Sequence, residues 1–154
     1  MGNENINFRQ AISPEAQFLS DLAIRSKSFW GYDASFLEEC RPVLTVTPED
    51  VRTIPVVVLE ERNLIIGFYS LKKIDNENRL DNLWLEPEYI GKGYGKAMFL
   101  DSIVKAKEIN WDHFRIVAEP YALNFYKKMG AIKLKDIKSR LGVNRYLPLM
   151  EIKF

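Results

Sequence analysis

The chain has 154 residues and a formal net charge of +1; 47% of the residues are hydrophobic and 12% are aromatic. This composition is typical of a globular chain and excludes disorder, and the small net charge gives no global indication of a nucleic-acid or membrane partner. A single cysteine, Cys40, excludes an internal disulfide framework, and with only His113 beside it the sequence argues against a zinc site. We expect one domain, residues 1–154, that binds no metal.

The first eleven residues contain no basic segment followed by an apolar run, so no secretory signal is expected. No apolar run reaches the ~20 residues that a membrane-spanning helix needs. These two features predict a cytoplasmic protein without a membrane partner.

The first third of the chain predicts one strand and then helices. Residues 6–12 favour a strand, and Ser13 is a candidate N-cap for the helix that follows. A turn at Gly31 leads to a second short helix, for which Asp33 is the expected cap. Residues 47–51 resemble a further cap-like turn.

The middle of the chain predicts an antiparallel meander, because residues 53–62, 63–74 and 76–87 are β-branched or alternate in polarity. In the third segment, strict alternation places positions 79, 81, 83 and 85 on one face. A helix, a strand, a short helix and two strands should complete the chain, at residues 96–109, 113–119, 122–129, 131–137 and 142–154. The order β-αα-βββ-α-β-α-ββ describes an α/β (α+β) fold: a mixed, mostly antiparallel sheet of about seven strands with helices on both faces.

Three glycines occupy alternate positions between the meander and the next helix, in "PEYIGKGYGKAM" (residues 87–98). Glycines there let backbone N–H groups converge on an anion at the amino terminus of the helix, a favourable place for phosphate. The Walker A pattern fails because Gly95-Lys96 is followed by Ala97. The dinucleotide pattern GxGxxG fails from both Gly91 and Gly93.

The same stretch resembles the [QR]-x-x-G-x-[GA] signature of the GNAT family of N-acetyltransferases, with Gly93 and Gly95 in the two small-residue positions. A second stretch, "AEPYALNFYKKMGA" (118–131), resembles the later motif of that family, in which a strand end leads to a short helix carrying a Tyr. The predicted element order matches the family along nearly the whole chain. The two motifs at this spacing make the resemblance specific.

The resemblance implies that acetyl-CoA is the cosubstrate, bound mostly by backbone. The fourth strand, splayed from its neighbour, would offer the backbone of Leu83 and Leu85 to the pantetheine amides. Ile90 stands where the family prefers Gln or Arg, so a side-chain contact is expected to be missing there. The implied contacts of the glycine turn are Ile90, Gly91, Lys92, Gly93, Tyr94, Gly95 and Lys96. Glu119 and Tyr121 occupy the places of a frequent cofactor-binding Asn, and Asn124 is the nearest amide, out of register.

The resemblance also implies direct acetyl transfer from acetyl-CoA to an amine in a ternary complex. Tyr126 would protonate the departing thiolate; the alternative is a core tyrosine. Asp81 would accept the proton of the amine, directly or through water; the alternative is a surface carboxylate paired with Arg79 or a lysine. Many members of the family dimerise, so a homodimer is an open alternative.

The acceptor side is expected at the junction of the first two helices, where "SKSFWGYDASF" (26–36) gathers aromatic residues around a carboxylate. The candidate acceptor contacts are Trp30, Tyr32, Asp33 and Tyr121. Aromatic faces suit an ammonium group, although core packing explains the same residues. Residues 1–62 hold 10 acidic and 6 basic side chains, which agrees weakly with a cationic acceptor.

Three classes of function compete. The leading one is acetylation of a primary amine on a small molecule or peptide, and the second is a non-catalytic acyl-CoA sensor or interaction module on the same fold. The third takes residues 127–145, which hold 7 basic side chains and one acidic, as a nucleic-acid patch. That segment lacks interleaved aromatic residues, so a solvated face or a basic rim near the adenosine 3′-phosphate is expected and no nucleic-acid partner.

Overall fold

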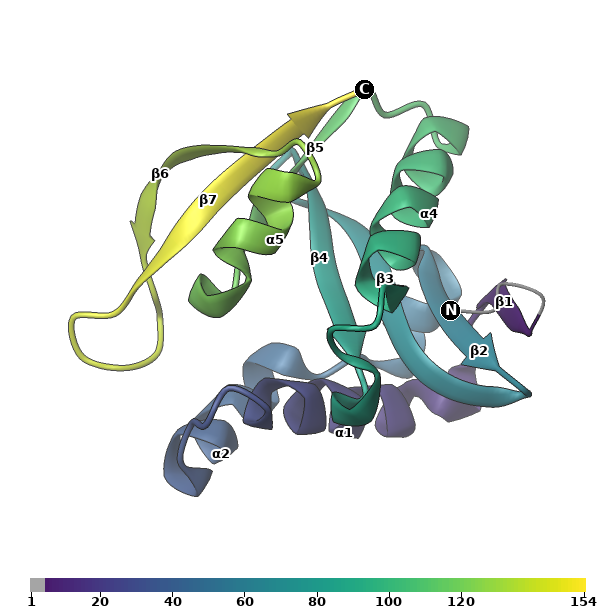
Figure 1. Cartoon of the computed structure of the whole chain (residues 1–154), viewed down its shortest axis with the longest axis horizontal. Helices are drawn as coiled ribbons and strands as arrows, with labels where there is room; N and C mark the ends of the chain where they lie inside the picture. The colour runs from purple at the N-terminus through teal and green to yellow at the C-terminus, as the bar shows by residue number, and fades with distance from the viewer. Residues whose placement is uncertain (1–4) are drawn as a thin grey trace.

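The computed structural model describes residues 5–154. The prediction that the first eleven residues form no secretory signal therefore rests partly on residues outside that range. Within residues 5–154, seven strands and five helices follow one another in the predicted order, one of the five an additional short helix (Figure 1). The strands are β1 Ile6–Gln10, β2 Val56–Glu61, β3 Leu64–Ile74, β4 Glu77–Leu85, β5 His113–Val117, β6 Ile132–Lys138 and β7 Tyr146–Lys153. The helices are α1 Ala16–Ser28, α2 Ala34–Leu44, α3 Pro48–Thr53, α4 Tyr94–Glu108 and α5 Leu123–Lys128.

The strands form one sheet in the order β1-β2-β3-β4-β5-β7-β6, and every neighbouring pair except one is antiparallel. The exception is the parallel pair β4–β5, which is in register only at Arg79 and Arg115. Beyond that point the two strands diverge, and β4 and β7 draw apart toward the bottom of Figure 1. The sheet is therefore open in its middle, as a splayed fourth strand requires.

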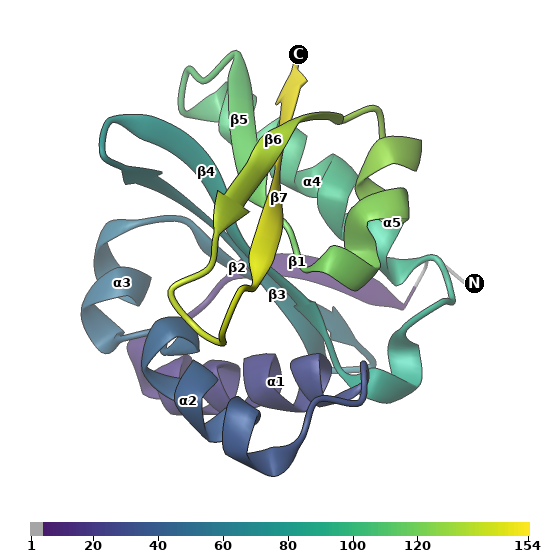
Figure 2. The ribbon, with the colours of Figure 1, turned by 90° about the vertical axis from the view of Figure 1, so that its left-hand side faces the viewer.

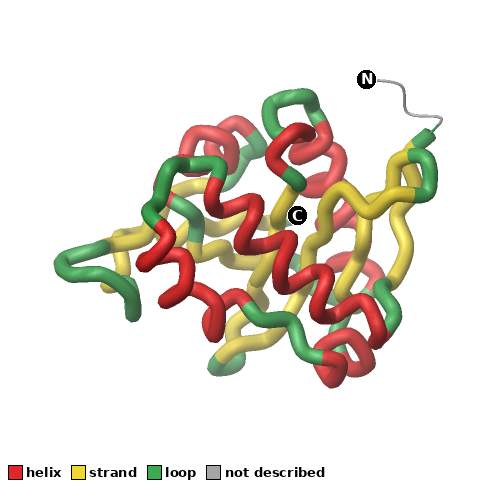
Figure 3. Tube along the Cα trace, turned by 90° about the horizontal axis from the view of Figure 1, so that it is seen from below, coloured by secondary structure: helices red, strands yellow, loops and turns green. Residues whose placement is uncertain are grey.

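Helices cover both faces of the sheet, because alternate residues of the central strands point to opposite sides. Phe68 of β3 faces α1 and packs with its Leu19 and Leu22, whereas Tyr69 faces α4 and packs in the cluster of Met98 and Phe99. Figure 2 shows α1 to α3 on one side of the strands and α4 and α5 on the other, and the view from below in Figure 3 shows helices in front of and behind the strands. Burying each such side chain fully contributes about 1.5–3 kcal/mol to the stability of the fold.

The start of α1 differs from the prediction. Ser13 does not cap it; instead residues 13–15 form a 3₁₀ turn, and the carboxylate of Glu15 accepts a 2.9 Å hydrogen bond from the N–H of Ile12. Asp33 does cap α2, since its carboxylate accepts a 2.8 Å bond from the N–H of Phe36. The cap-like turn at residues 47–51 continues into a helix, α3, held by a reciprocal capping box.

The predicted alternation along β4 is wrong at Asp81. Ser70 of β3 pairs with Asn82, yet the next residue, Leu71, pairs with Leu80, so Asp81 is the extra residue of a β-bulge. The bulge resets the alternation, and Leu80 joins Leu83 on the face toward α4 and α5. A bulge depends on pairing with the neighbouring strand, and residues 76–87 alone carry no sign of it.

Candidate active site

A cleft of about 1200 Å³ follows the opening of the sheet. Its walls come from the glycine turn before α4, from β4, from the turn between β5 and α5, from the end of α1 and from the loop between β6 and β7. The cleft exists because β4 and β5 separate beyond Arg79, so the backbone of β4 is not paired on that side within the described residues.

The glycine turn forms one end of the cleft. Gly91 and Gly93 have φ of 82° and 92°, a left-handed conformation that other residues adopt only with strain, and Gly93 is the residue before the first turn of α4. A Cβ on Gly95 would lie 3.3 Å from Cε1 of Phe125, so glycine there lets α4 approach α5. The N–H groups of the first helical turn have no partner within the helix, and they suit a phosphate group.

Most of the predicted cofactor residues line the cleft, and three do not. Those that line it are Leu83, Leu85, Ile90, Gly91, Gly93, Gly95 and Lys96. Lys92 and Asn124 are exposed outside it, and the Tyr94 hydroxyl donates a hydrogen bond to Glu61, away from the cleft. The N–H of Leu85 donates to the hydroxyl of Ser26 on α1 at 3.3 Å, so α1 approaches β4 at the point where β5 has diverged from it.

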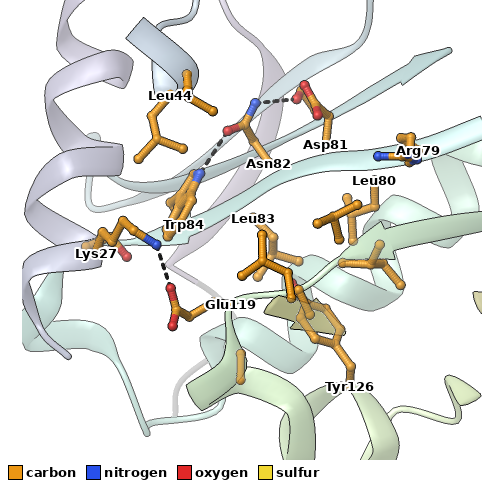
Figure 4. A pocket seen from close by; sticks show the side chains of 18 of the residues that line it. Lys27, Leu44, Arg79, Leu80, Asp81, Asn82, Leu83, Trp84, Glu119 and Tyr126 are labelled. Carbon is orange, nitrogen blue, oxygen red and sulfur yellow. Dashed lines mark hydrogen bonds and ion pairs between the residues drawn. The ribbon is translucent and has the colours of Figure 1, made fainter. Parts of the chain in front are cut away.

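Tyr126 lies on α5, 6% exposed, in contact with the rings of Phe99 and Phe125 at 5.9 and 5.1 Å between centroids. Its side chain lines the cleft, and within residues 5–154 its hydroxyl has no hydrogen-bond partner (Figure 4). Burial, with a smaller contribution from the charge of Glu119, raises the pKa of the phenol above its usual value. A protonated phenol that no protein group engages is available to donate a proton into the cleft.

Asp81 lies at the cleft on the β4 bulge. Although its side chain is open to solvent, desolvation by the cleft walls raises the pKa of the carboxyl, and the charges of Lys72 and Arg79 only partly oppose this effect. Arg79 pairs with Glu77, and Lys72 lies 3.5 Å from Asp50, so neither forms an ion pair with Asp81. A carboxylate with a raised pKa is a stronger base than an ordinary aspartate.

The polar residues beside Asp81 hold each other in place. Asn82 accepts a 2.8 Å hydrogen bond from the indole N–H of Trp84 and donates a 2.9 Å bond to the hydroxyl of Ser70. Asn82 and Trp84 face α1 and α2, opposite to Leu83, and both line the cleft (Figure 4). This wall is therefore fixed before any ligand arrives.

The predicted acceptor residues divide into two groups. Trp30 and Tyr121 line the cleft as a stacked pair, 5.4 Å between ring centroids, and so join the α1–α2 junction to the β5–α5 turn. Tyr32 and Asp33 do not line the cleft: Asp33 caps α2, and the hydroxyl of Tyr32 donates to Glu119 at 2.5 Å.

Sequence reasoning missed a buried ionic cluster at the same end of the cleft. Lys27 and Glu119 form a 2.6 Å ion pair with side chains 9% and 7% exposed, drawn in Figure 4, and Arg145 lies 3.9 Å from the same carboxylate. The only signal was Glu119 in place of an expected amide. Lys27 is the last buried residue of α1, and nothing in the sequence distinguishes it from a solvated lysine.

Within residues 5–154, no group of three or more metal-ligating side chains is positioned to hold a metal ion. In the same range, no helix is both long and apolar enough to cross a membrane.

Comparison with known proteins agrees with this fold. A protein-family model described as an acetyltransferase (GNAT) domain matches residues 52–130, which span half of the chain from α3 through the glycine turn to the end of α5. The chain belongs to the GNAT family of acetyltransferases.

Solved structures of the same fold cover almost the whole chain. PaiA N-acetyltransferase from Thermoplasma acidophilum, in complex with coenzyme A, is 21% identical with a TM-score of 0.78 over 97% of this chain and 99% of its own. YncA, a putative acetyltransferase from Salmonella typhimurium with acetyl-CoA, is 15% identical with a TM-score of 0.68 over 97% and 94%. The ribosomal-protein-S18-alanine N-acetyltransferase from Escherichia coli is 11% identical, with a TM-score of 0.70 over 96% and 93%. No curated protein sequence matches the chain.

Proposed function

We propose that this protein transfers an acetyl group from acetyl-CoA to a primary amine of a small molecule or peptide, directly in a ternary complex. The observation that carries the proposal is the position of Tyr126: its ring is buried, and its protonated hydroxyl lines the same cleft as the glycine turn and the open side of β4. Acetyl-CoA, when bound, would supply the activated acetyl thioester.

The residues present fit that cosubstrate. The left-handed Gly91 and Gly93 turn backbone N–H groups outward ahead of α4, and Lys96 adds positive charge beside them. Ile90 offers no hydrogen bond from its side chain, so the turn binds the pyrophosphate through its backbone. The open side of β4 at Leu83 suits the amides of the pantetheine arm. CoA and acetyl-CoA in the PaiA and YncA structures support this assignment.

Two protons move in the proposed reaction, and the chain has a group for each. The amine nitrogen forms a bond to the acetyl carbon while the carbon–sulfur bond breaks. Asp81 accepts a proton from the nitrogen, directly or through water, and Tyr126 donates one to the departing sulfur. Tyr126 is suited to donate because its pKa is raised, and Asp81 is suited to accept for the same reason.

The proposal is tested by measuring release of the CoA thiol when the purified protein is given acetyl-CoA and a panel of primary amines. We expect release to depend on both the amine and the enzyme, with a mono-acetylated product of matching mass. CoA binding without thiol release from any amine would contradict the proposal and favour an acyl-CoA sensor on this fold.

A further inference from the structure

The ionic cluster of Lys27, Tyr32, Glu119 and Arg145 contains more positive than negative charge. Glu119 is its only carboxylate, and one of its oxygens, Oε2, lies 2.6 Å from the ammonium of Lys27. The other carboxylate oxygen, Oε1, accepts a hydrogen bond from the hydroxyl of Tyr32. Burial and then the bond to Glu119 raise the pKa of Tyr32 to about 12, so the phenol is neutral. Lys27 and Glu119 neutralise each other, which leaves the charge of Arg145.

Arg145 makes no close bond to a carboxylate. Its guanidinium donates to two neutral oxygens, the hydroxyl of Tyr32 at 3.1 Å and that of Ser139 at 3.3 Å, and lies over the ring of Phe36. Its nearest carboxylate oxygen, on Glu119, is 3.9 Å away and already engaged by Lys27. The Arg145 side chain is only 18% exposed, and arginine stays charged. A largely buried cation without a close counterion favours an anion beside it.

This cation faces the cleft at the acceptor end. Arg145 belongs to the β6–β7 loop, which reaches toward α2 in Figure 2. It lines the cleft together with Arg140 of the same loop and Lys138 at the end of β6. Lys27 lies 5.9 Å from the ring of Trp84, which is three residues along β4 from Asp81, or roughly 10 Å at the rise of a strand. Arg145, which carries the excess charge, and Asp81, the candidate base, line this same cleft.

The acidic bias of residues 1–62, which suggested a cationic acceptor, does not extend into the cleft. Of the 10 acidic residues in that segment, only Asp50 lines it. The basic segment 127–145 instead contributes four cationic side chains to the lining and no carboxylate: Lys128, Lys138, Arg140 and Arg145. The carboxylate at the acceptor end, Glu119, is paired with Lys27, so a second ammonium group on the acceptor would meet the charge of Arg145 there.

We propose that the acceptor carries a carboxylate in addition to its amine, and that Arg145 binds this carboxylate. The planar guanidinium matches a carboxylate through two parallel hydrogen bonds, which gives both affinity and orientation. The inference rests on the proposed function and narrows its substrate class to amino carboxylates, as opposed to polyamines.

The test compares pairs of acceptors: an amino carboxylate and the carboxamide with the same carbon skeleton. Several pairs of increasing chain length are measured. Spermidine is included as a polycationic acceptor. We expect the carboxylate member of the best pair to have a kcat/KM at least about tenfold higher, which corresponds to one charge-assisted contact. Arg145→Gln should bring the ratio of kcat/KM for the carboxylate to kcat/KM for the carboxamide close to one, and Arg145→Lys should give an intermediate ratio. Arg52→Gln, on the exposed side of α3 and outside the cleft, should leave the ratio as it is.

A binding measurement separates this inference from the proposed function. The same acid and amide pairs are titrated calorimetrically into the protein saturated with CoA. Tighter binding of the acid that Arg145→Gln removes supports the carboxylate subsite even if no amine is acetylated, in which case only the proposed function fails. Equal affinity for acid and amide, or a preference for spermidine that Arg145→Gln leaves intact, would overturn the inference.

Discussion

Lys27 and Glu119, 92 residues apart in the chain, form a 2.6 Å ion pair with less than a tenth of either side chain exposed. The pair joins the end of α1 to the turn after β5, the two walls between which the acceptor end of the cleft lies. The Lys27 ammonium also lies 4.8 Å from the centre of the Tyr32 ring. Together with the stacked rings of Trp30 and Tyr121, this buried pair holds the two walls against each other.

Removing one partner of this pair should cost more stability than removing both charges. Glu119→Gln leaves Lys27 buried beside Arg145 without a carboxylate, and we expect a loss of about 3–5 kcal/mol in the free energy of unfolding. Lys27→Met combined with Glu119→Gln should lose less than Glu119→Gln alone. Urea denaturation of the wild-type protein and the two variants measures these losses, and a loss in the double variant equal to or larger than that in Glu119→Gln would contradict the explanation by an unpaired Lys27 charge.

Gly93→Glu should abolish cofactor binding. The side chain would place a negative charge at the amino terminus of α4, where a phosphate is expected, and like charges in contact cost several kcal/mol, on the order of 100-fold or more in affinity. Calorimetric titration with CoA measures the effect. Gly31→Glu is the matched control, because Gly31 has a similar φ of 85° but lies outside the cleft. Unchanged CoA affinity in Gly93→Glu would remove the phosphate site from this turn.

Tyr126→Phe should lower kcat by on the order of 100-fold or more while the affinity for CoA changes little, because only the donated proton is lost and the ring still packs against Phe99 and Phe125. Tyr94→Phe is the control, since that hydroxyl bonds to Glu61 outside the cleft. An unchanged kcat in Tyr126→Phe would reduce Tyr126 to a core residue.

Asp81→Asn should make the protein slower but more stable at pH 7. The folded-state pKa of Asp81 is raised by desolvation, so this group supports folding below its unfolded pKa and loses that contribution as the pH rises through the folded value. Asparagine removes this pH-dependent loss, so the stability gain at pH 7 should shrink toward pH 4, as thermal unfolding can measure. The fall in kcat/KM at low pH, which protonation of Asp81 causes in the proposed mechanism, should disappear as well.

Asp50→Asn is the control, because its effect on stability at pH 7 should be opposite to that of Asp81→Asn. Burial opposes the charge of Asp50, but hydrogen bonds from Thr47 and the ammonium of Lys72 outweigh it and hold its pKa below the usual value. The variant should therefore lose stability at pH 7, and less so at pH 4. If both variants changed stability in the same direction, local desolvation would not explain the behaviour of Asp81.

Part of the candidate site was predictable, because some of its residues lie in short continuous motifs. The glycine turn and Tyr126 are specified by neighbours within a dozen residues, and both line the cleft. Lys92, Tyr94 and Asn124 belong to the same motifs, yet the direction of each side chain depends on packing against other elements, and none of them lines the cleft.

The sequence by itself determined the glycine turn, the cap of α2 and the order of the strands and helices except α3, because periodicity, turn chemistry and capping act over a few neighbouring residues. Only the tertiary structure decided the bulge at Asp81 and the charge at the acceptor end. The bulge is a property of pairing with β3, and the cluster brings together Lys27, Glu119 and Arg145 from three distant segments. Contacts between distant residues leave no periodic signal in the chain, so the cleft becomes electropositive only once the protein has folded.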